Sequence, residues 1–127
     1  MVGFSNQYNH FLYVLVPGVA TRDENGDYEA EDPSWKLWGM CREETNGKGT
    51  YVVIADKGLY QYSSLIQLPS GTPYIPDGTD VVVSDEELDV SSLTRTGIQE
   101  LIREGRVRIA KESAKFDVGR LHCRMWL

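Results

Sequence analysis

The sequence has few of the side chains that carry catalysis or bind metals. Its 127 residues include only two cysteines and two histidines. A structural zinc site needs four ligands, usually introduced by a Cys-x-x-Cys pair, and the sequence has no such pair. The soft ligands are limited to His10, Cys41, His122 and Cys123. We therefore expect no metal site and no cofactor.

Long hydrophobic runs are also lacking. The run at residues 11–16 has six apolar residues and ends at Pro17-Gly18, whereas a membrane-spanning helix needs roughly 20. The first seven residues, MVGFSNQ, lack the basic region of a secretory signal. We expect a soluble, intracellular protein that has no membrane partner.

The sequence lacks the common catalytic motifs. It contains no Gly-x-Gly-x-x-Gly turn, no phosphate-binding Gly-Lys-Ser/Thr loop and no Gly-x-Ser-x-Gly elbow. His122 and Cys123 are adjacent, so on a strand they face opposite sides and cannot act as base and nucleophile. The carboxylates of residues 85–89 could act as an acid–base pair, but such a run is more typical of a solvated turn. Because neither histidine has an evident partner, we expect no enzyme.

The two cysteines could form at most one disulfide. A domain of this size does not need a disulfide to fold, and free cysteine commonly behaves as a small buried hydrophobe. We expect Cys41 and Cys123 to be reduced and buried, with the disulfide left open as the alternative.

Charge is distributed unevenly along the chain, whose net charge is -6. Residues 1–94 hold five Lys/Arg and fifteen Asp/Glu, whereas residues 95–127 hold eight and four. Solvated faces of both signs would account for this. The sharper hypothesis is that an acidic face of one copy meets a basic face of another copy or of a partner.

An acidic stretch, TRDENGDYEAEDPS, occupies residues 21–34 and carries six acidic side chains. We expect an exposed loop there. Asp23, Asn25 and Asp27 have the spacing of the first calcium ligands of an EF-hand, but the sixth position is Tyr28 rather than Gly, and the twelfth is a serine. The EF-hand pattern fails, and a looser calcium site in residues 23–32 stays open.

Alternating apolar residues between turn residues predict six or seven short strands. The first is apolar on both alternating faces, so we expect it to be covered on both sides. Asn46-Gly47 predicts a hairpin corner, and the last strand is predicted to pair with the sheet or with a partner. The predicted strands are residues 9–16, 35–42, 51–55, 59–68, 81–83, 106–110 and 120–127.

One segment predicts a helix, TGIQELIREG at residues 96–105. Thr96 and Gln99 have the spacing of a capping box, and Gly105 is placed to end the helix. Together, these elements predict a mainly β fold in a single domain of residues 1–127. We expect a small antiparallel β-barrel or sandwich of six to seven strands with one short helix near 96–105.

The basic C-terminal part offers one nucleic-acid hypothesis. Residues 93–109 resemble the second half of the S4-type RNA-binding motif, in which a helix ends in glycine and leads into a basic strand. Phosphate contacts would then come from Arg95, Arg103, Arg106 and Arg108. An RNA-binding accessory domain is therefore the alternative function, and nucleic acid is not the favoured partner.

A longer pattern links a strand ending in LIQLP, a Pro/Gly loop and the stretch IPDGTDVVV. It resembles small head-completion and stopper proteins of tailed bacteriophages. The matching residues are Tyr62, Ser63, Leu65, Ile66, Leu68, Pro69, Ile75, Gly78, Thr79, Val81 and Val83. The resemblance implies a non-enzymatic virion protein, a head-tail connector that forms a ring with other copies of itself. Portal or tail components would be its neighbours, in the virion or the host cytoplasm.

The loop at residues 69–78 is expected to project and to carry binding, because loops of this kind commonly do. The tryptophans are candidate interface anchors, although a core position is the alternative for each. Exposed positions of the last strand complete the set of candidates. The candidate interface residues are Pro69, Thr72, Pro73, Tyr74, Asp77, Trp35, Trp38, Arg120, Arg124 and Trp126.

Overall fold

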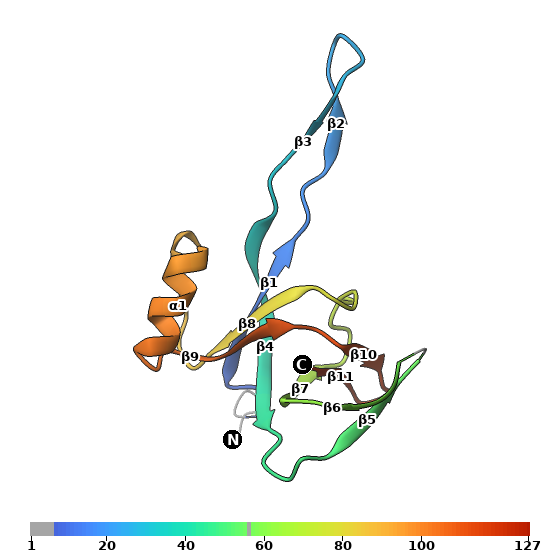
Figure 1. Cartoon of the computed structure of the whole chain (residues 1–127), viewed down its shortest axis with the longest axis vertical. Helices are drawn as coiled ribbons and strands as arrows, with labels where there is room; N and C mark the ends of the chain where they lie inside the picture. The colour runs from blue at the N-terminus through green and yellow to red at the C-terminus, as the bar shows by residue number, and fades with distance from the viewer. Residues whose placement is uncertain (1–6, 56) are drawn as a thin grey trace.

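The computed structural model describes residues 7–55 and 57–127 of the chain. Within them lie eleven strands, one α-helix and a single 3₁₀ turn (Figure 1). The elements in chain order are β1 (His10–Val16), β2 (Ala20–Arg22), β3 (Tyr28–Ala30), β4 (Ser34–Thr45), β5 (Tyr51–Ile54), β6 (Gly58–Gln61), β7 (Ser64–Pro69), β8 (Asp80–Ser84), η2 (Val90–Ser92), α1 (Arg95–Arg103), β9 (Val107–Glu112), β10 (Lys115–Val118) and β11 (His122–Trp126).

Seven strands form one antiparallel sheet in the order β10-β11-β7-β4-β1-β8-β9. Its two end strands, β9 and β10, are successive parts of one bent segment. The N–H of Ser113 donates to the Thr79 carbonyl (2.8 Å), and the N–H of Ala114 donates to the Trp126 carbonyl (2.8 Å). Because successive N–H groups of a strand point to opposite edges, the segment pairs with β8 on one edge and with β11 on the other. The sheet therefore curls on itself, as expected for a small antiparallel barrel with one helix.

The inside of the curled sheet is apolar. Along β7, residues Ser64, Ile66 and Leu68 are buried, while the residues between them are half-buried, which is the alternation of a strand with one face inward. Both cysteines are free and buried, as expected. The buried core consists of Leu12, Val14, Cys41, Ile66, Leu68, Ile75, Val81, Val83, Phe116, Cys123, Met125 and Leu127.

A second apolar cluster lies on the outside of the sheet, under α1. Here Tyr13 of β1 is fully buried although its neighbours Leu12 and Val14 point into the core. The prediction that β1 is covered on both faces is therefore confirmed. The cluster consists of Tyr13, Val82, Leu88, Leu93, Leu101 and Val107.

The helix begins earlier than the capping box predicted. Thr94 is the N-cap, with an extended backbone, and its hydroxyl accepts the N–H of Gly97 (3.0 Å). The prediction that Thr96 and Gln99 form a capping box is wrong, because both residues already lie inside α1. No side chain fits at Gly97, since a Cβ there would lie 2.0 Å from the Ser92 carbonyl oxygen.

The end of α1 follows the sequence prediction. Gly105 takes a φ of 73°, and its N–H bonds the Ile102 carbonyl while the Arg106 N–H bonds the Leu101 carbonyl. This is a Schellman motif, which needs a left-handed residue and so favours glycine. Across the described residues, no helix is long and apolar enough to cross a bilayer.

Two hairpins, β2–β3 and β5–β6, lie outside the main sheet. The predicted hairpin at Asn46-Gly47 is wrong, because β4 pairs with β1 and β7 whereas β5 pairs with β6. Instead, the Asn46 amide donates to the carbonyls of Thr50 (2.9 Å) and Tyr62 (2.7 Å). The predicted strand at residues 59–68 is split in two, into β6 and β7.

Replacing Tyr13 by Phe is expected to lower the free energy of unfolding by about 1–3 kcal/mol. The buried hydroxyl accepts the Leu88 N–H (2.7 Å) and donates to the Leu88 carbonyl (3.2 Å), and both backbone groups would lose their partner. Tyr74→Phe is the control, because its ring is 59% exposed, and it should change stability by less than about 0.5 kcal/mol. Urea unfolding of both variants measures this, and equal effects would contradict the assigned role.

Candidate functional site

An arm, defined as residues 17–33, projects from the barrel (Figure 1). Its strands β2 and β3 pair with each other in a sheet of two strands, with Thr21 opposite Glu29 and Arg22 opposite Tyr28. The prediction that residues 21–34 are exposed is confirmed for most of them. The prediction of a loop is wrong, because β2 and β3 pair and continue the hairpin of β1 and β4 outward. The arm is therefore a supported extension of the barrel strands.

The tip of the arm is a fixed turn. The Asp23 carboxylate accepts the N–H groups of Asn25 and Asp27 (2.9 Å each), and Gly26 has a φ of 84°. These bonds occupy one oxygen of the first residue of the proposed calcium loop. Within residues 7–55 and 57–127, no group of three or more His, Cys, Asp or Glu side chains could hold a metal ion.

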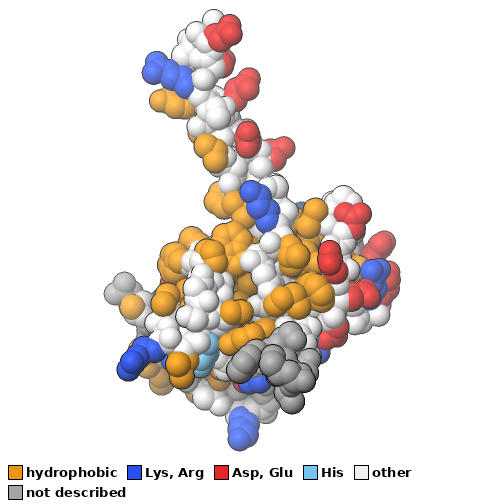
Figure 2. All heavy atoms as spheres, turned by 180° about the vertical axis from the view of Figure 1, so that it is seen from behind, with side chains coloured by type: hydrophobic (Ala, Val, Ile, Leu, Met, Phe, Trp, Pro, Cys, Tyr) orange, Lys and Arg blue, Asp and Glu red, His pale blue; other side chains and the backbone are white. Residues whose placement is uncertain are grey.

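The surface of the arm is acidic, with isolated apolar side chains. Six carboxylates lie in residues 23–32, against one cation, Arg22, whose Nε donates to the Gly26 carbonyl (3.3 Å). Tyr28 is 73% exposed and Val19 is 66% exposed. Figure 2 shows the acidic side chains spread along the arm. No strand of the seven-stranded sheet pairs with β2 or β3.

A basic face lies on the outer side of β10, β11, β7 and β4. Cross-strand pairing places Arg124 beside Gln67, and Gln67 beside Arg42, so these three side chains share one face. Arg120 is exposed in the turn between β10 and β11. We define this basic face by Arg42, Glu44, Lys115, Asp117 and Arg124 of the strands together with Arg120 of the adjoining turn.

The tryptophans are all at least half-buried. The indole of Trp126 is only 6% exposed, because Lys115 Nζ and Arg124 Cζ each lie 5.3 Å from its ring centre. Trp35 packs against the cluster under α1. Trp38 packs against the core, and its Nε1 donates to the Pro73 carbonyl (3.1 Å). These positions fit the alternative prediction that the tryptophans are core residues. Their role as interface anchors stays a prediction.

The Pro/Gly loop at residues 69–78 does not project. Ile75 is fully buried in the core, and both the N–H and the hydroxyl of Thr72 donate to the Pro69 carbonyl. The expectation of a projecting loop is wrong, because this buried side chain anchors the loop over the barrel. Pro73, Tyr74 and Asp77 stay exposed, so their role in an interface stays a prediction.

An apolar pocket of about 290 Å³ lies where this loop meets the base of the arm. Several residues that line it come from the loop, and others come from the end of β1. The lining residues are Val14, Leu15, Val16, Pro17, Trp38, Tyr74, Ile75, Pro76 and Thr79.

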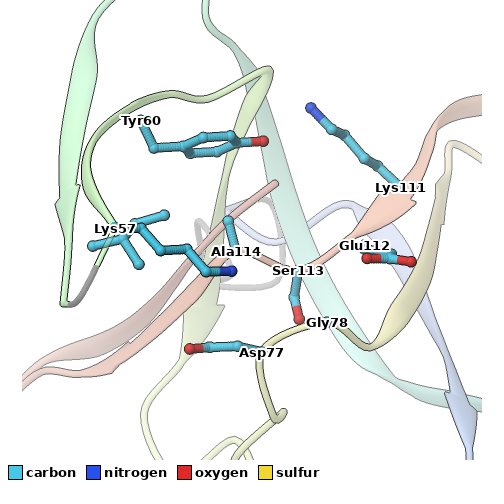
Figure 3. A pocket seen from close by; sticks show the side chains of 9 residues that line it. Lys57, Tyr60, Asp77, Gly78, Lys111, Glu112, Ser113 and Ala114 are labelled. Carbon is cyan, nitrogen blue, oxygen red and sulfur yellow. The ribbon is translucent and has the colours of Figure 1, made fainter.

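A second pocket, of about 340 Å³, lies beside the bend between β9 and β10 (Figure 3). Two lysines and two carboxylates line it, namely Lys57, Lys111, Asp77 and Glu112. The Ser113 hydroxyl donates to the Pro76 carbonyl (2.8 Å) and accepts the Thr79 N–H (3.2 Å). Both bonds of the Ser113 hydroxyl therefore help to hold the bend. No histidine that could act as a base for this hydroxyl lines the pocket.

An ion-pair cluster surrounds the buried carboxylate of Glu43 and joins β4 to β9. Glu43 points inward from β4, and its carboxylate accepts hydrogen bonds from Ser64 (2.6 Å), Thr45 (2.9 Å) and Arg108 Nε (2.9 Å). Arg108 also bonds Asp85 (3.1 Å). Burial alone raises the pKa of Glu43, but these hydrogen bonds outweigh it and the pKa lies below its ordinary value.

His10 belongs to this ion-pair cluster, so the expectation that neither histidine has a partner is wrong. Its Nδ1 accepts the Glu43 N–H (2.9 Å), and its Nε2 lies 3.3 Å from Asp85 Oδ1. Burial, and then the nearby Arg108 cation, lower its pKa below the ordinary value. His122 and Cys123 do face opposite sides of β11, with only Cys123 fully buried.

A β-bulge places Arg108 in this ion-pair cluster. Val83 pairs with Ile109 and Ser84 pairs with Val107, so Arg108 has no residue opposite it in the ladder. Sequence reasoning missed the cluster because its members come from distant segments and the bulge leaves no local signal. Two of the arginines predicted to contact RNA are held in ion pairs. Arg108 pairs with Glu43 and Asp85, and Arg106 pairs with Glu86 and Glu104.

The free energy of unfolding is expected to fall as the pH drops below about 6.5, because the unfolded chain then protonates His10 before the folded chain does. Below about 4.5, protonation of Glu43 in the unfolded chain adds a second loss, since its folded pKa is also lowered. Urea unfolding across the acidic range measures both. His10→Gln should flatten only the first decline, and an unchanged slope in that variant would contradict this assignment.

Cys41 is expected to resist thiol reagents in the folded protein. Its side chain is fully buried, and burial raises its pKa to about 12, with Glu43 adding to the effect. Because the thiolate is the reactive form, labelling should require unfolding. Peptide mapping after treatment with iodoacetamide, with and without urea, measures this. Labelling at equal rates in both conditions would contradict it.

No protein-family model, curated protein or solved structure matches this chain. The resemblance to phage head-completion and stopper proteins therefore depends on the pattern at residues 62–83 alone and stays a prediction.

Proposed function

We propose that this chain is a non-enzymatic structural subunit of a tailed-bacteriophage particle, a head-tail connector or head-completion protein. It acts by contacts with other copies of itself and with portal or tail components. The observation that carries the proposal is the arm of residues 17–33, which extends from the barrel and pairs with no other element of the described chain.

The arm supports an assembly role because its residues bury little apolar surface within their own chain, although ordering them costs conformational entropy. Ordering each residue costs about 1–2 kcal/mol of conformational entropy, while side chains such as Val19 and Tyr28 stay mostly exposed. The hydrogen bonds of Asp23 nevertheless hold the tip in one conformation. A rigid, exposed hairpin is suited to insertion against a neighbouring subunit, because little further ordering is needed on binding.

The barrel adds an exposed apolar surface. Phe11 of β1 lies opposite Met40 of β4, and Leu15 lies opposite Trp35, on the side of the sheet facing away from the core. Leu37 is 45% exposed and Met40 is 36% exposed. Figure 2 shows hydrophobic side chains gathered on the body below the arm. Such exposed apolar patches commonly mark protein interfaces.

The polar clusters favour a structural role over catalysis. In the ion-pair cluster, His10 accepts a backbone N–H and Glu43 is bonded by three donors, so these groups stabilise the fold. The RNA-binding alternative has less support, because Arg106 and Arg108 are held by carboxylates.

Sequencing several kilobases of source DNA on either side of the reading frame tests the phage assignment. Neighbouring genes that encode portal, capsid or tail components are expected. Neighbours concerned with translation or RNA modification would overturn the assignment.

Removing the arm is expected to abolish self-association and to leave the barrel folded. Val16 and Ser34 are opposite each other in the β1–β4 ladder, so an Asn-Gly turn can replace residues 17–33 and join them. Sedimentation velocity would compare the arm-deleted chain with the full chain, and circular dichroism would check that the variant is folded. A folded variant that assembles to the same size as the full chain would contradict this role.

A further inference from the structure

We infer that the acidic arm of one copy docks on the basic face of a second copy, an inference that rests on the proposed assembly function. The basic face is the outer side of β10, β11, β7 and β4, and it carries Arg42, Lys115, Arg120 and Arg124. The contact joins two different surfaces, so each copy both donates an arm and accepts one.

Charge complementarity favours this pairing. The arm has six carboxylates and one arginine. On the basic face, Arg42 pairs with Glu44, and Lys115 lies 3.8 Å from Asp117. Arg124 stacks on Trp126 and lies opposite Asp117 in the β10–β11 ladder, but, like Arg120, it forms no ion pair with any described residue. Two arginines of this face thus keep their charge available for an acidic partner.

The surfaces also match in their apolar side chains. The turn between β10 and β11 exposes Leu121 by 85%, next to Arg120 along the chain. The arm exposes Tyr28 and Val19 among its carboxylates. Contact between these side chains would remove apolar surface from water, which supplies affinity that exposed ion pairs alone do not.

The occupant is a second copy because the arm points away from its own barrel (Figure 1). The six steps from Val16 to Arg22, the last strand residue before the tip, span roughly 20 Å at about 3.3 Å per residue. That reach extends beyond the molecule's own surface towards a neighbour. A nucleic acid is the weaker candidate, because the chain has a net charge of -6 and a projecting acidic arm, both of which repel a polyanion.

A contact between two different surfaces is heterologous, so it repeats from copy to copy. Such contacts build a closed ring when the rotation between copies closes, and an open filament when it does not. The inferred docking therefore supplies the head-to-tail contact that a ring-forming connector would need.

Paired charge reversals test the docking. One variant carries Glu24→Lys and Glu29→Lys on the arm, away from the hydrogen bonds of the tip. The other carries Arg120→Glu and Arg124→Glu on the basic face. Each is expected to lower the association constant by about tenfold or more, measured by sedimentation equilibrium. Added salt should also lower the association constant of the full chain, because salt screens the attraction between these charges.

Mixing the two variants is the decisive step. In the mixture, the lysines introduced on the first variant's arm, whose net charge changes from -5 to -1, meet the glutamates introduced on the second variant's face. The second variant's acidic arm meets the first variant's unchanged face. Equimolar mixtures should regain the association of the full chain. The matched control is Glu100→Lys with Arg103→Glu, which reverses exposed charges on α1 and should leave association unchanged.

The outcomes separate this inference from the proposed function. If both charge-reversed variants assemble like the full chain while the arm-deleted chain stays monomeric, the arm binds elsewhere, and the docking on the basic face is overturned. Association without any need for the arm would overturn the assembly role of the arm as well. If the full chain stays monomeric but binds a double-stranded oligonucleotide, and Arg120→Glu with Arg124→Glu abolishes that binding, the basic face serves nucleic acid and the docking is overturned.

Discussion

The bend between β9 and β10 is the constraint on which the rest of the structure depends. Ser113 bonds Thr79 through its N–H and Pro76 through its hydroxyl, while the next residue, Ala114, bonds Trp126. These bonds join the two ends of the sheet across a single turn of backbone. Because the sheet curls there, β11 lies between β10 and β7, and the C-terminal strand is held on both edges. The inner faces then enclose one apolar core.

Curling of the sheet also decides which surfaces are left for partners. A flat sheet would present two free edge strands that other chains could extend, whereas here the bent segment pairs at both ends of the strand order. The second edges of β9 and β10 carry no ladder, so contacts with neighbours can use these edges, the outer faces or the hairpins that lie outside the sheet. The arm continues the ladder of β1 and β4, so its direction is fixed by two strands that are anchored in the barrel.

Local patterns predicted the parts of the fold that depend on neighbouring residues. The two-sided burial of β1 follows from its unbroken apolar run, and the end of α1 follows from Gly105. The Asn46-Gly47 hairpin could not be judged locally, because its failure depends on β4 already pairing with two strands from elsewhere. The ion-pair cluster was likewise hidden, since Glu43 and Arg108 meet only through the curl of the sheet and a bulge. Likewise, the basic face needs the cross-strand register that places Arg42 in line with Arg124.

The distribution of charge follows from the same division between barrel and arm. Inside the barrel, a carboxylate such as Glu43 is tolerated because three donors compensate for its burial. On the arm, six carboxylates stay in water and therefore pay no desolvation penalty. Their mutual repulsion opposes any compact packing of the arm. The backbone pairing of β2 with β3 and the Asp23 turn keep the hairpin ordered against that repulsion. An ordered, self-repelling hairpin is stabilised most by a cationic surface, and the chain builds such a surface on the strands that its own arm points away from.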